Sequence, residues 1–117
     1  HGEKFFRNIE EKICLKLLNN KNCIISLGGG SIVNSNVRNM IKNNSYSIYL
    51  KVNNSILLQR LSNSKKRPIL NNSNKELILK DLYKKRKKFY NEADLIIENN
   101  FAKKEIISKI KFQINQL

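Results

Sequence analysis

Three consecutive glycines, Gly28–Gly30, are the first feature of the sequence that could do chemistry. They follow the short apolar run 24–27 and precede a further apolar stretch. Glycine loses more backbone freedom on folding than any other residue, so three in a row at the end of a strand need a reason. Their backbone N–H groups can meet a ligand without a Cβ clash, as in the ligand-binding loops of open α/β sheets. The run predicts either a binding loop or a tight turn against a helix.

The five arginines are the second feature, because lysine outnumbers arginine 18 to 5. Where lysine is the default cation, an arginine suggests a need for a planar, bidentate donor. Arg86 falls on the apolar stripe of its expected helix, between Leu82 and Phe89. Its charge therefore requires an anionic partner, either an internal carboxylate or a ligand. Arg7, three residues before Glu10, is compatible with a surface ion pair or with a guanidinium held in a fixed orientation.

A polar stretch over residues 62–74 contains the only proline, Pro68, and is expected to be a loop. Arg67 precedes this proline, which disfavours helical geometry and keeps Arg67 extended. A single arginine on a mobile segment suits an arginine finger, although a solvated loop charge is the alternative. Arg60 lies seven residues earlier, near the end of an expected helix.

The hydrophobic pattern indicates the elements that must position these residues. Helices are expected over 3–19, 34–43, 54–61, 75–90 and 102–116, and strands over 23–27, 47–52 and 93–98. Strands that alternate with helices predict an α/β fold with a parallel sheet covered on both faces. The first helix should bury one broad apolar stripe, made of Phe5, Phe6, Ile9, Ile13, Leu17 and Leu18. Asn34 or Ser35 is available as the N-cap of the second helix.

The bulk composition limits the class of protein. At 117 residues the chain is expected to be a single domain, 1–117, and no apolar run is long enough to cross a bilayer. No signal peptide is visible, and the apolar surroundings of Cys14 and Cys23 predict buried, reduced thiols in a cytoplasmic protein. The one histidine and the two cysteines do not form a metal-binding cluster. The net charge of +14 leaves open a small basic nucleic-acid-binding module.

Four motifs, taken together, resemble shikimate kinase along essentially the whole chain. They are Gly2-Glu3…Phe6-Arg7…Glu10, Ser26-Leu27-Gly28-Gly29-Gly30, Arg60…Arg67-Pro68-Ile69-Leu70 and Arg86…Tyr90-Asn91-Glu92-Ala93-Asp94. Their order and spacing fit the family: Gly28 comes 21 positions after Arg7, and Arg86 comes 19 positions after Arg67. Each motif is weak alone, and all four in register are specific.

The resemblance implies a role for each of these positions. Arg7 and Arg86 would bind the carboxylate of shikimate, and Gly28–Gly30 would close on its ring and hydroxyls. Glu10 would support Arg7, and Phe6 would line the substrate pocket. On the ATP side, the resemblance implies a catalytic lid arginine over the phosphates at Arg67, on the lid loop 62–74, and an adenine-side arginine at Arg60. The implied reaction transfers the γ-phosphoryl group of ATP to the shikimate 3-hydroxyl with Mg²⁺, in the chorismate pathway to aromatic amino acids.

The sequence departs from the family in one respect. A Walker A loop with its lysine and hydroxyl, and the aspartate that contacts the substrate hydroxyl, do not occur in these 117 residues. The chain therefore reads as the carboxyl-terminal two-thirds of a shikimate kinase, with a P-loop-kinase-like three-layer α/β/α fold and three of an expected five strands. We expect the chain alone to be inactive and poorly stable, and the complete protein to be monomeric.

Two alternatives to this reading remain. One is the small basic nucleic-acid-binding module, which is supported by the net charge and by the lysines at positions 84, 85, 87 and 88. This alternative lacks a stacking strand rich in aromatic residues. The other is a related small-molecule kinase with a different substrate, against which stand the pair Arg7 and Arg86 and the triple glycine. The shikimate kinase reading predicts that neither nucleic acid nor a membrane is a partner.

Overall fold

The computed structural model describes residues 2–53, 55–57, 59, 75–100 and 102–117. These residues form two compact units. The first consists of His1–Ser47 with Arg86–Asp94, and the second of Ile48–Lys85 with Leu95–Leu117. The expectation of a single domain stays a prediction.

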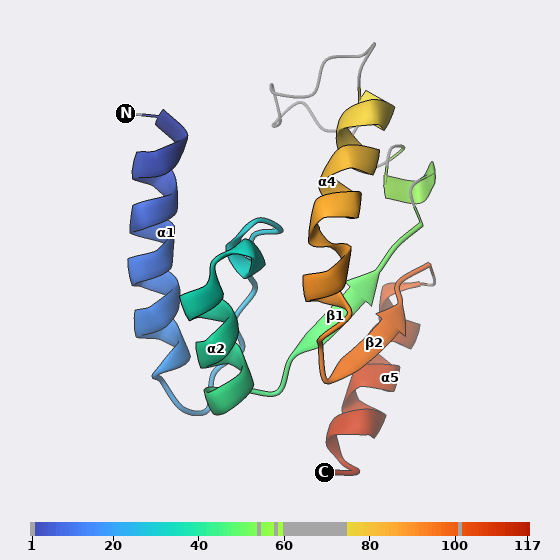
Figure 1. Ribbon diagram of the computed structural model, residues 1–117. Helices are drawn as coiled ribbons and strands as arrows, with labels where there is room; N and C mark the ends of the chain where they lie inside the picture. Colours follow the sequence, from blue (N-terminus) through green and yellow to red (C-terminus); the bar gives the residue numbers. More distant parts are fainter. Residues whose placement is uncertain (1, 54, 58, 60–74, 101) are drawn as a thin grey trace. The chain divides into compact units, whose positions relative to one another are not determined.

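The first unit contains helix α1 (Gly2–Leu18), the 3-10 helix η1 (Ser31–Val33), helix α2 (Ser35–Asn44) and the end of helix α4 (Lys75–Tyr90). Helices α1 and α2 lie side by side (Figure 1). Their core consists of the buried residues Cys14, Leu18, Val37 and Ile41, packed with the half-buried Leu15, Ile25, Leu27, Ile32 and Met40. The Gly28–Gly30 loop leads directly into η1 and is therefore attached to this core.

Helix α2 begins and ends one residue later than the sequence predicts, and its start is capped. The side-chain oxygen of Asn34 accepts a hydrogen bond from the Val37 N–H at 3.0 Å, so Asn34 rather than Ser35 is the N-cap. This bond satisfies one of the N–H groups that have no partner inside the helix. Because Val37 is only 1% exposed, the same turn fixes the deepest apolar side chain of the unit.

The segment Cys23–Leu27 is not a strand, contrary to the prediction. It is irregular, and within the described residues no strand pairs with it. A strand exists only through hydrogen bonds to a neighbour, which is why an apolar run alone did not suffice. The outer side chains of the segment are accordingly uncovered: Ile24 is fully exposed, and Cys23 is exposed although the sequence predicts a buried thiol. The prediction of a buried Cys14 is confirmed.

The buried face of α1 is narrower than the sequence predicts. Of the predicted stripe only Leu18 is buried, whereas Phe5, Phe6, Ile9, Ile13 and Leu17 are each at least 40% exposed. The helix instead packs on α2 through Cys14, Leu15 and Leu18. The segment is helical as predicted, but no helix or strand among the described residues covers the rest of its apolar stripe.

The second unit contains a parallel pair of strands, β1 (Ile48–Lys51) and β2 (Leu95–Glu98), together with helix α5 (Lys103–Ile114) and the first part of α4. The two arrows point the same way in Figure 1, and Ile48 pairs with Leu95. Parallel strands need a long crossover, and α4 lies in the chain between these two. The α/β class is thereby confirmed, with two strands in the described residues where the sequence predicts three.

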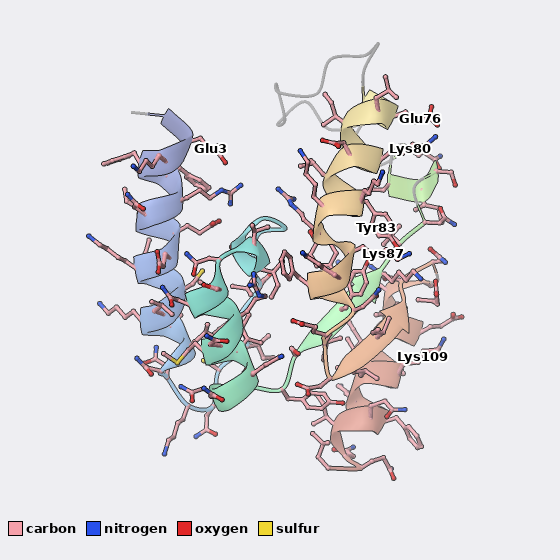
Figure 2. All side chains as sticks on the ribbon, viewed as in Figure 1. Glu3, Glu76, Lys80, Tyr83, Lys87 and Lys109 are labelled. Carbon is pink, nitrogen blue, oxygen red and sulfur yellow. The ribbon has the colours of Figure 1, made fainter. Side chains whose placement is uncertain are left out.

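The remaining helices agree with the sequence. Helix α4 has the predicted bounds, α5 is shorter than predicted by one residue at its start and two at its end, and residues 55–57 and 59 of the helix expected over 54–61 are helical. One turn apart on α4, Glu76 and Lys80 form an exposed ion pair at 3.3 Å (Figure 2). Within the described residues, every helix is too short or too polar to span a bilayer.

Candidate functional site

The glycine loop of the first unit is a tight turn. The Ser31 N–H donates to the Gly28 carbonyl at 3.1 Å, and the Val33 N–H donates to the Gly30 carbonyl at 3.2 Å. Gly30 has φ −91° and ψ −11°, a conformation that any residue can adopt. Backbone conformation therefore does not explain why residue 30 is a glycine. The explanation lies in the atoms that surround it.

Arg7 occupies the space beside Gly30. A Cβ on Gly30 would stand 2.6 Å from each terminal nitrogen of the Arg7 guanidinium and 2.8 Å from its central carbon. A Cβ atom does not come this close to a non-bonded atom, so a side chain at position 30 would clash with the guanidinium. Gly30 has no side chain and therefore leaves room for Arg7. The third glycine of the run is thus required by a side chain of this protein that comes from α1.

Two carboxylates hold Arg7 in this position. Its Nη1 donates to Glu10 Oε1 at 2.7 Å, and its Nε donates to Glu3 Oε1 at 2.9 Å. The Glu10 side chain is 17% exposed and the Glu3 side chain 77%, so the Glu10 bond is the better shielded of the two. The hydrogen bond to Glu10 is the main cause that raises the pKa of Arg7, while partial burial acts in the opposite direction. The support of Arg7 by Glu10 that the family resemblance implies agrees with this contact.

Arg86 and Tyr90 lie beside the next glycine along the loop. A Cβ on Gly29 would stand 3.4 Å from Arg86 Nη1 and 3.3 Å from the Tyr90 hydroxyl. The Tyr90 hydroxyl donates to the Gly29 carbonyl at 2.7 Å. The two side chains are four residues apart on α4 and so lie on one face of that helix. Arg7 and Arg86 therefore meet the same loop from two different helices.

The sequence leaves open whether Arg86 pairs with an internal carboxylate or with a ligand, and its surroundings in the structure bear on this choice. Arg86 is half-buried, whereas Lys84, Lys85, Lys87 and Lys88 around it are exposed, as the sequence predicts. Within the described part of the chain, Arg86 forms no ion pair with a carboxylate. A half-buried guanidinium without an internal anion favours a ligand anion as its partner.

Donors for a ligand are also present in the backbone. In the residues that the structure covers, neither the Gly29 N–H nor the Gly30 N–H makes a hydrogen bond. The Ser31 hydroxyl, on a residue that is 2% exposed, likewise has no partner there. Two guanidinium groups and two unpaired N–H groups thus gather around a span of two residues. Such a set of donors is complementary to a small, oxygen-rich anion.

The other predicted site residues are placed as follows. Gly28 is in ordinary contact distance of Glu10, with 3.6 Å between its Cβ position and Glu10 Oε2. Phe6 is 54% exposed, and the Arg7 guanidinium lies 5.2 Å from the centre of its ring. Arg60, Arg67 and the expected lid loop 62–74 lie outside the described residues, so their roles stay predictions.

Two residues that organise the loop were not assigned to the site from sequence. Tyr90 belongs to a family motif, and no role was assigned to it from sequence. Arg38 was the one arginine without a proposed role, and it donates to the carbonyls of Ile32 at 2.9 Å and Val33 at 2.7 Å. Its guanidinium also stacks on the Phe89 ring at 3.9 Å. Arginine is rare in this chain, and that rarity could have drawn attention to Arg38. For Tyr90 no sequence signal was available, because only the tertiary structure shows that its hydroxyl donates to the Gly29 carbonyl.

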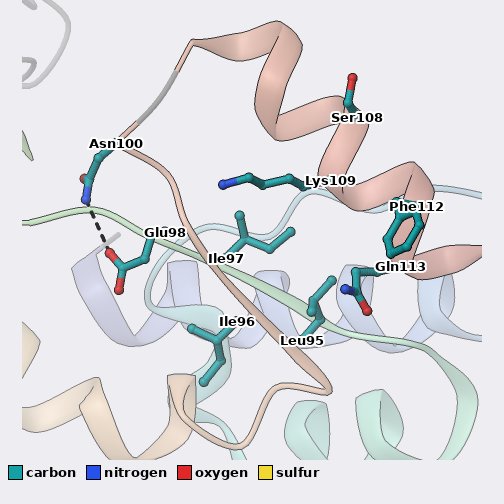
Figure 3. Close-up of a pocket in the computed structure, with 9 residues that line it drawn as sticks. All are labelled: Leu95, Ile96, Ile97, Glu98, Asn100, Ser108, Lys109, Phe112 and Gln113. Atoms are coloured by element: carbon teal, nitrogen blue, oxygen red, sulfur yellow. Dashed lines mark hydrogen bonds between the residues drawn. The ribbon is translucent and has the colours of Figure 1, made fainter. Parts of the chain in front are cut away.

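The second unit has an open hollow of about 820 Å³ between β2 and α5 (Figure 3). Its lining combines four apolar residues with five polar ones: Leu95, Ile96, Ile97 and Phe112, and Glu98, Asn100, Ser108, Lys109 and Gln113. Across the described residues, His, Cys, Asp and Glu side chains do not gather in threes in a way that could hold a metal ion.

Comparisons with known proteins agree on one family. The sequence matches the family model described as shikimate kinase over residues 1–115. The structure is similar to that of shikimate kinase from Acinetobacter baumannii in complex with shikimate, with a TM-score of 0.87 and 31% identity over 98% of this chain and 65% of that one. It also resembles shikimate kinase from Bacteroides thetaiotaomicron, with a TM-score of 0.85 and 24% identity over 99% and 70%.

This chain thus spans 65% of the length of the Acinetobacter protein. A search of curated proteins gave no match.

Proposed function

Because the chain belongs to the shikimate kinase family, we propose that it provides the shikimate-binding site for the ATP-dependent phosphorylation of the shikimate 3-hydroxyl, a step towards chorismate. The single observation that carries this proposal is the convergence of Arg7 and Arg86 on Gly29 and Gly30. A solved relative at 31% identity is a complex with shikimate, which supports the choice of substrate.

The chemistry of shikimate fits the donors of the loop. Shikimate is a planar carboxylate on a ring that carries three hydroxyl groups. In the proposal the guanidinium groups of Arg7 and Arg86 bind the carboxylate, and each charge-assisted hydrogen bond contributes about 1.5–3 kcal/mol when shielded from water. The free N–H groups of Gly29 and Gly30 donate to substrate oxygens. Glu10 binds no substrate atom and fixes the plane of Arg7.

The ATP side of the proposal rests on family resemblance alone. We assign Arg67 to the phosphates and Arg60 to the adenine. The 117 residues contain no GxxxxGK[ST] sequence, which cradles the ATP phosphates and supplies a Mg²⁺ ligand in P-loop enzymes. The described residues do not fit a magnesium site either. We therefore assign no residue to Mg²⁺ and propose that this chain alone binds shikimate without transferring phosphate.

A pair of charge-removing variants tests the substrate assignment in the full-length gene product. Arg86→Gln should weaken shikimate binding about tenfold or more, because it removes a shielded contact to the carboxylate. Lys85→Gln removes the same charge one residue earlier, from a side chain that is 70% exposed and pairs with Asp81 at 3.0 Å. This control should bind shikimate like the wild type. Isothermal titration calorimetry with shikimate and, separately, with ATP gives both affinities.

The two ligands separate the possible outcomes. A loss confined to shikimate in Arg86→Gln supports the carboxylate role. Equal losses for shikimate and ATP would contradict it, and so would an equal effect of Lys85→Gln. Wild-type protein that does not bind shikimate would overturn the proposed function as a whole.

A further inference from the structure

The orientation of the peptide group between Gly29 and Gly30 must be fixed by a contact from outside the loop. With glycine on both sides it can rotate with little steric cost, so a different rotation would exchange the directions of its carbonyl and its N–H. The N–H groups of Ser31 and Val33 donate to the carbonyls of Gly28 and Gly30, so neither of these turn bonds restrains the Gly29–Gly30 peptide group. Its orientation must come from elsewhere.

Tyr90 supplies the anchor. Its hydroxyl donates to the Gly29 carbonyl at 2.7 Å, and this is the only hydrogen bond found on that carbonyl among the described residues. The bond crosses 61 positions of the sequence and joins the loop to the last residue of α4. Because the peptide is trans, a carbonyl that points at Tyr90 directs the N–H of Gly30 the opposite way.

The same end of α4 also holds η1, the short helix that follows the glycine loop. Phe89, the neighbour of Tyr90, stacks on Arg38, and Arg38 donates to two carbonyls of η1. Arg86, one turn earlier, lies against Gly29. Arg86 and Tyr90 therefore contact the glycine loop itself, whereas Phe89 acts on the neighbouring η1 through Arg38. Among the described residues, Tyr90 alone hydrogen-bonds the Gly29–Gly30 peptide group.

We propose that Tyr90 is a positioning residue for shikimate binding: its hydroxyl fixes the Gly29–Gly30 peptide so that the Gly30 N–H is presented to the substrate beside Arg7 and Arg86. The inference rests on the proposed function. Tyr90 touches no substrate atom and acts through the backbone of the loop.

The variant Tyr90→Phe tests this role, because it removes one hydroxyl and keeps the ring. In the full-length gene product, shikimate binding should weaken about fivefold, the scale of one neutral hydrogen bond. The affinity for ATP and the midpoint of thermal unfolding should stay close to the wild type. Tyr46→Phe is the matched control, since Tyr46 lies in the same unit, is 38% exposed and has no described hydrogen bond. It should leave both affinities unchanged.

Steady-state kinetics provides a second readout. Loss of an oriented donor that acts equally on bound substrate and transition state raises KM for shikimate and leaves kcat within about twofold. A merely structural role would instead lower the unfolding midpoint and affect both substrates together. The inference is overturned if Tyr90→Phe binds shikimate as tightly as Tyr46→Phe, or if it lowers kcat at unchanged KM. Wild-type protein that fails to bind shikimate would overturn both the proposed function and this inference, whereas normal binding by Tyr90→Phe overturns only the latter.

Discussion

Arg7 and Gly30 share one small space: a methyl group on the glycine would lie 2.6 Å from both terminal nitrogens of the guanidinium. The contact joins α1 to the glycine loop, and Glu10 holds the Arg7 guanidinium by accepting a hydrogen bond from Nη1 at 2.7 Å. A residue without a side chain and a residue with a long one are therefore parts of a single arrangement. A substitution at one of the two positions should therefore displace the residue at the other.

Gly30→Ala should impair shikimate binding much more than folding. The clash falls on the end of a flexible side chain, which can move aside at little cost to the fold but then leaves its position over the loop. We expect shikimate affinity to fall about tenfold or more and the unfolding midpoint to drop only a few degrees. Calorimetry and a thermal melt monitored by circular dichroism measure the two effects.

Gly28→Ala is the matched control for that substitution. A Cβ at Gly28 would meet Glu10 at 3.6 Å and Ser31 at 3.8 Å, which is ordinary contact. It should therefore disturb Arg7 less. Similar losses of shikimate affinity in both alanine variants would show that the loop tolerates no side chain at all and would refute the specific role of the Gly30 contact.

Shikimate binding should not depend on pH across the neutral range through Arg7. The hydrogen bond to Glu10 raises the pKa of the guanidinium, so the stabilisation it gives is fully present below the unfolded pKa of arginine and is lost only as pH rises through the still higher folded value. That window lies above about pH 12. Calorimetric affinities between about pH 6 and about pH 9 should therefore be flat, since the substrate carboxylate is also ionised there. A protonation step in shikimate binding within this range would contradict the role of Arg7 as an anchor of the carboxylate.

Asn34→Ala should destabilise the first unit. It removes the hydrogen bond from the Val37 N–H to the Asn34 side chain, and loss of an N-cap costs about 0.5–2 kcal/mol. Urea unfolding followed by circular dichroism should show a lower midpoint with an unchanged slope. Asn34→Asp, which keeps the accepting oxygen, should restore most of the stability. If the aspartate variant is as unstable as the alanine variant, capping is not the cause.

The positive charge should not bring tight binding to nucleic acid. The lysines next to Arg86 are exposed and form a solvated face, while the aromatic residue in that turn, Phe89, is occupied by Arg38 and Lys88. We expect no salt-sensitive binding of duplex or single-stranded DNA tighter than about 1 μM near physiological salt. Fluorescence anisotropy with a labelled oligonucleotide measures this. Sub-micromolar affinity with a steep salt dependence would favour the basic binding module.

Local pattern was sufficient for the helices and for the pair of parallel strands. The apolar period of α4 determined its bounds, and the β-rich runs before Val52 and Glu98 indicated β1 and β2, because these signals depend on residues close in sequence. The stretch 23–27 carried the same signal and is not a strand. Strand formation depends on a neighbour, and no local pattern contains that information.

The sequence by itself indicated the residues of a candidate site. Two of the five arginines, one glutamate and three consecutive glycines were identified from residue type and from spacing shared with a family. Only the tertiary structure decided what each of them does to the others. It placed Arg7 over Gly30 and left Arg86 without an internal carboxylate partner in the described residues. It also brought in Tyr90, across 61 positions of the chain, to hold a carbonyl. The physical reason is that spacing within one helix orders side chains on a face, whereas contacts between distant segments are set by how the apolar faces pack.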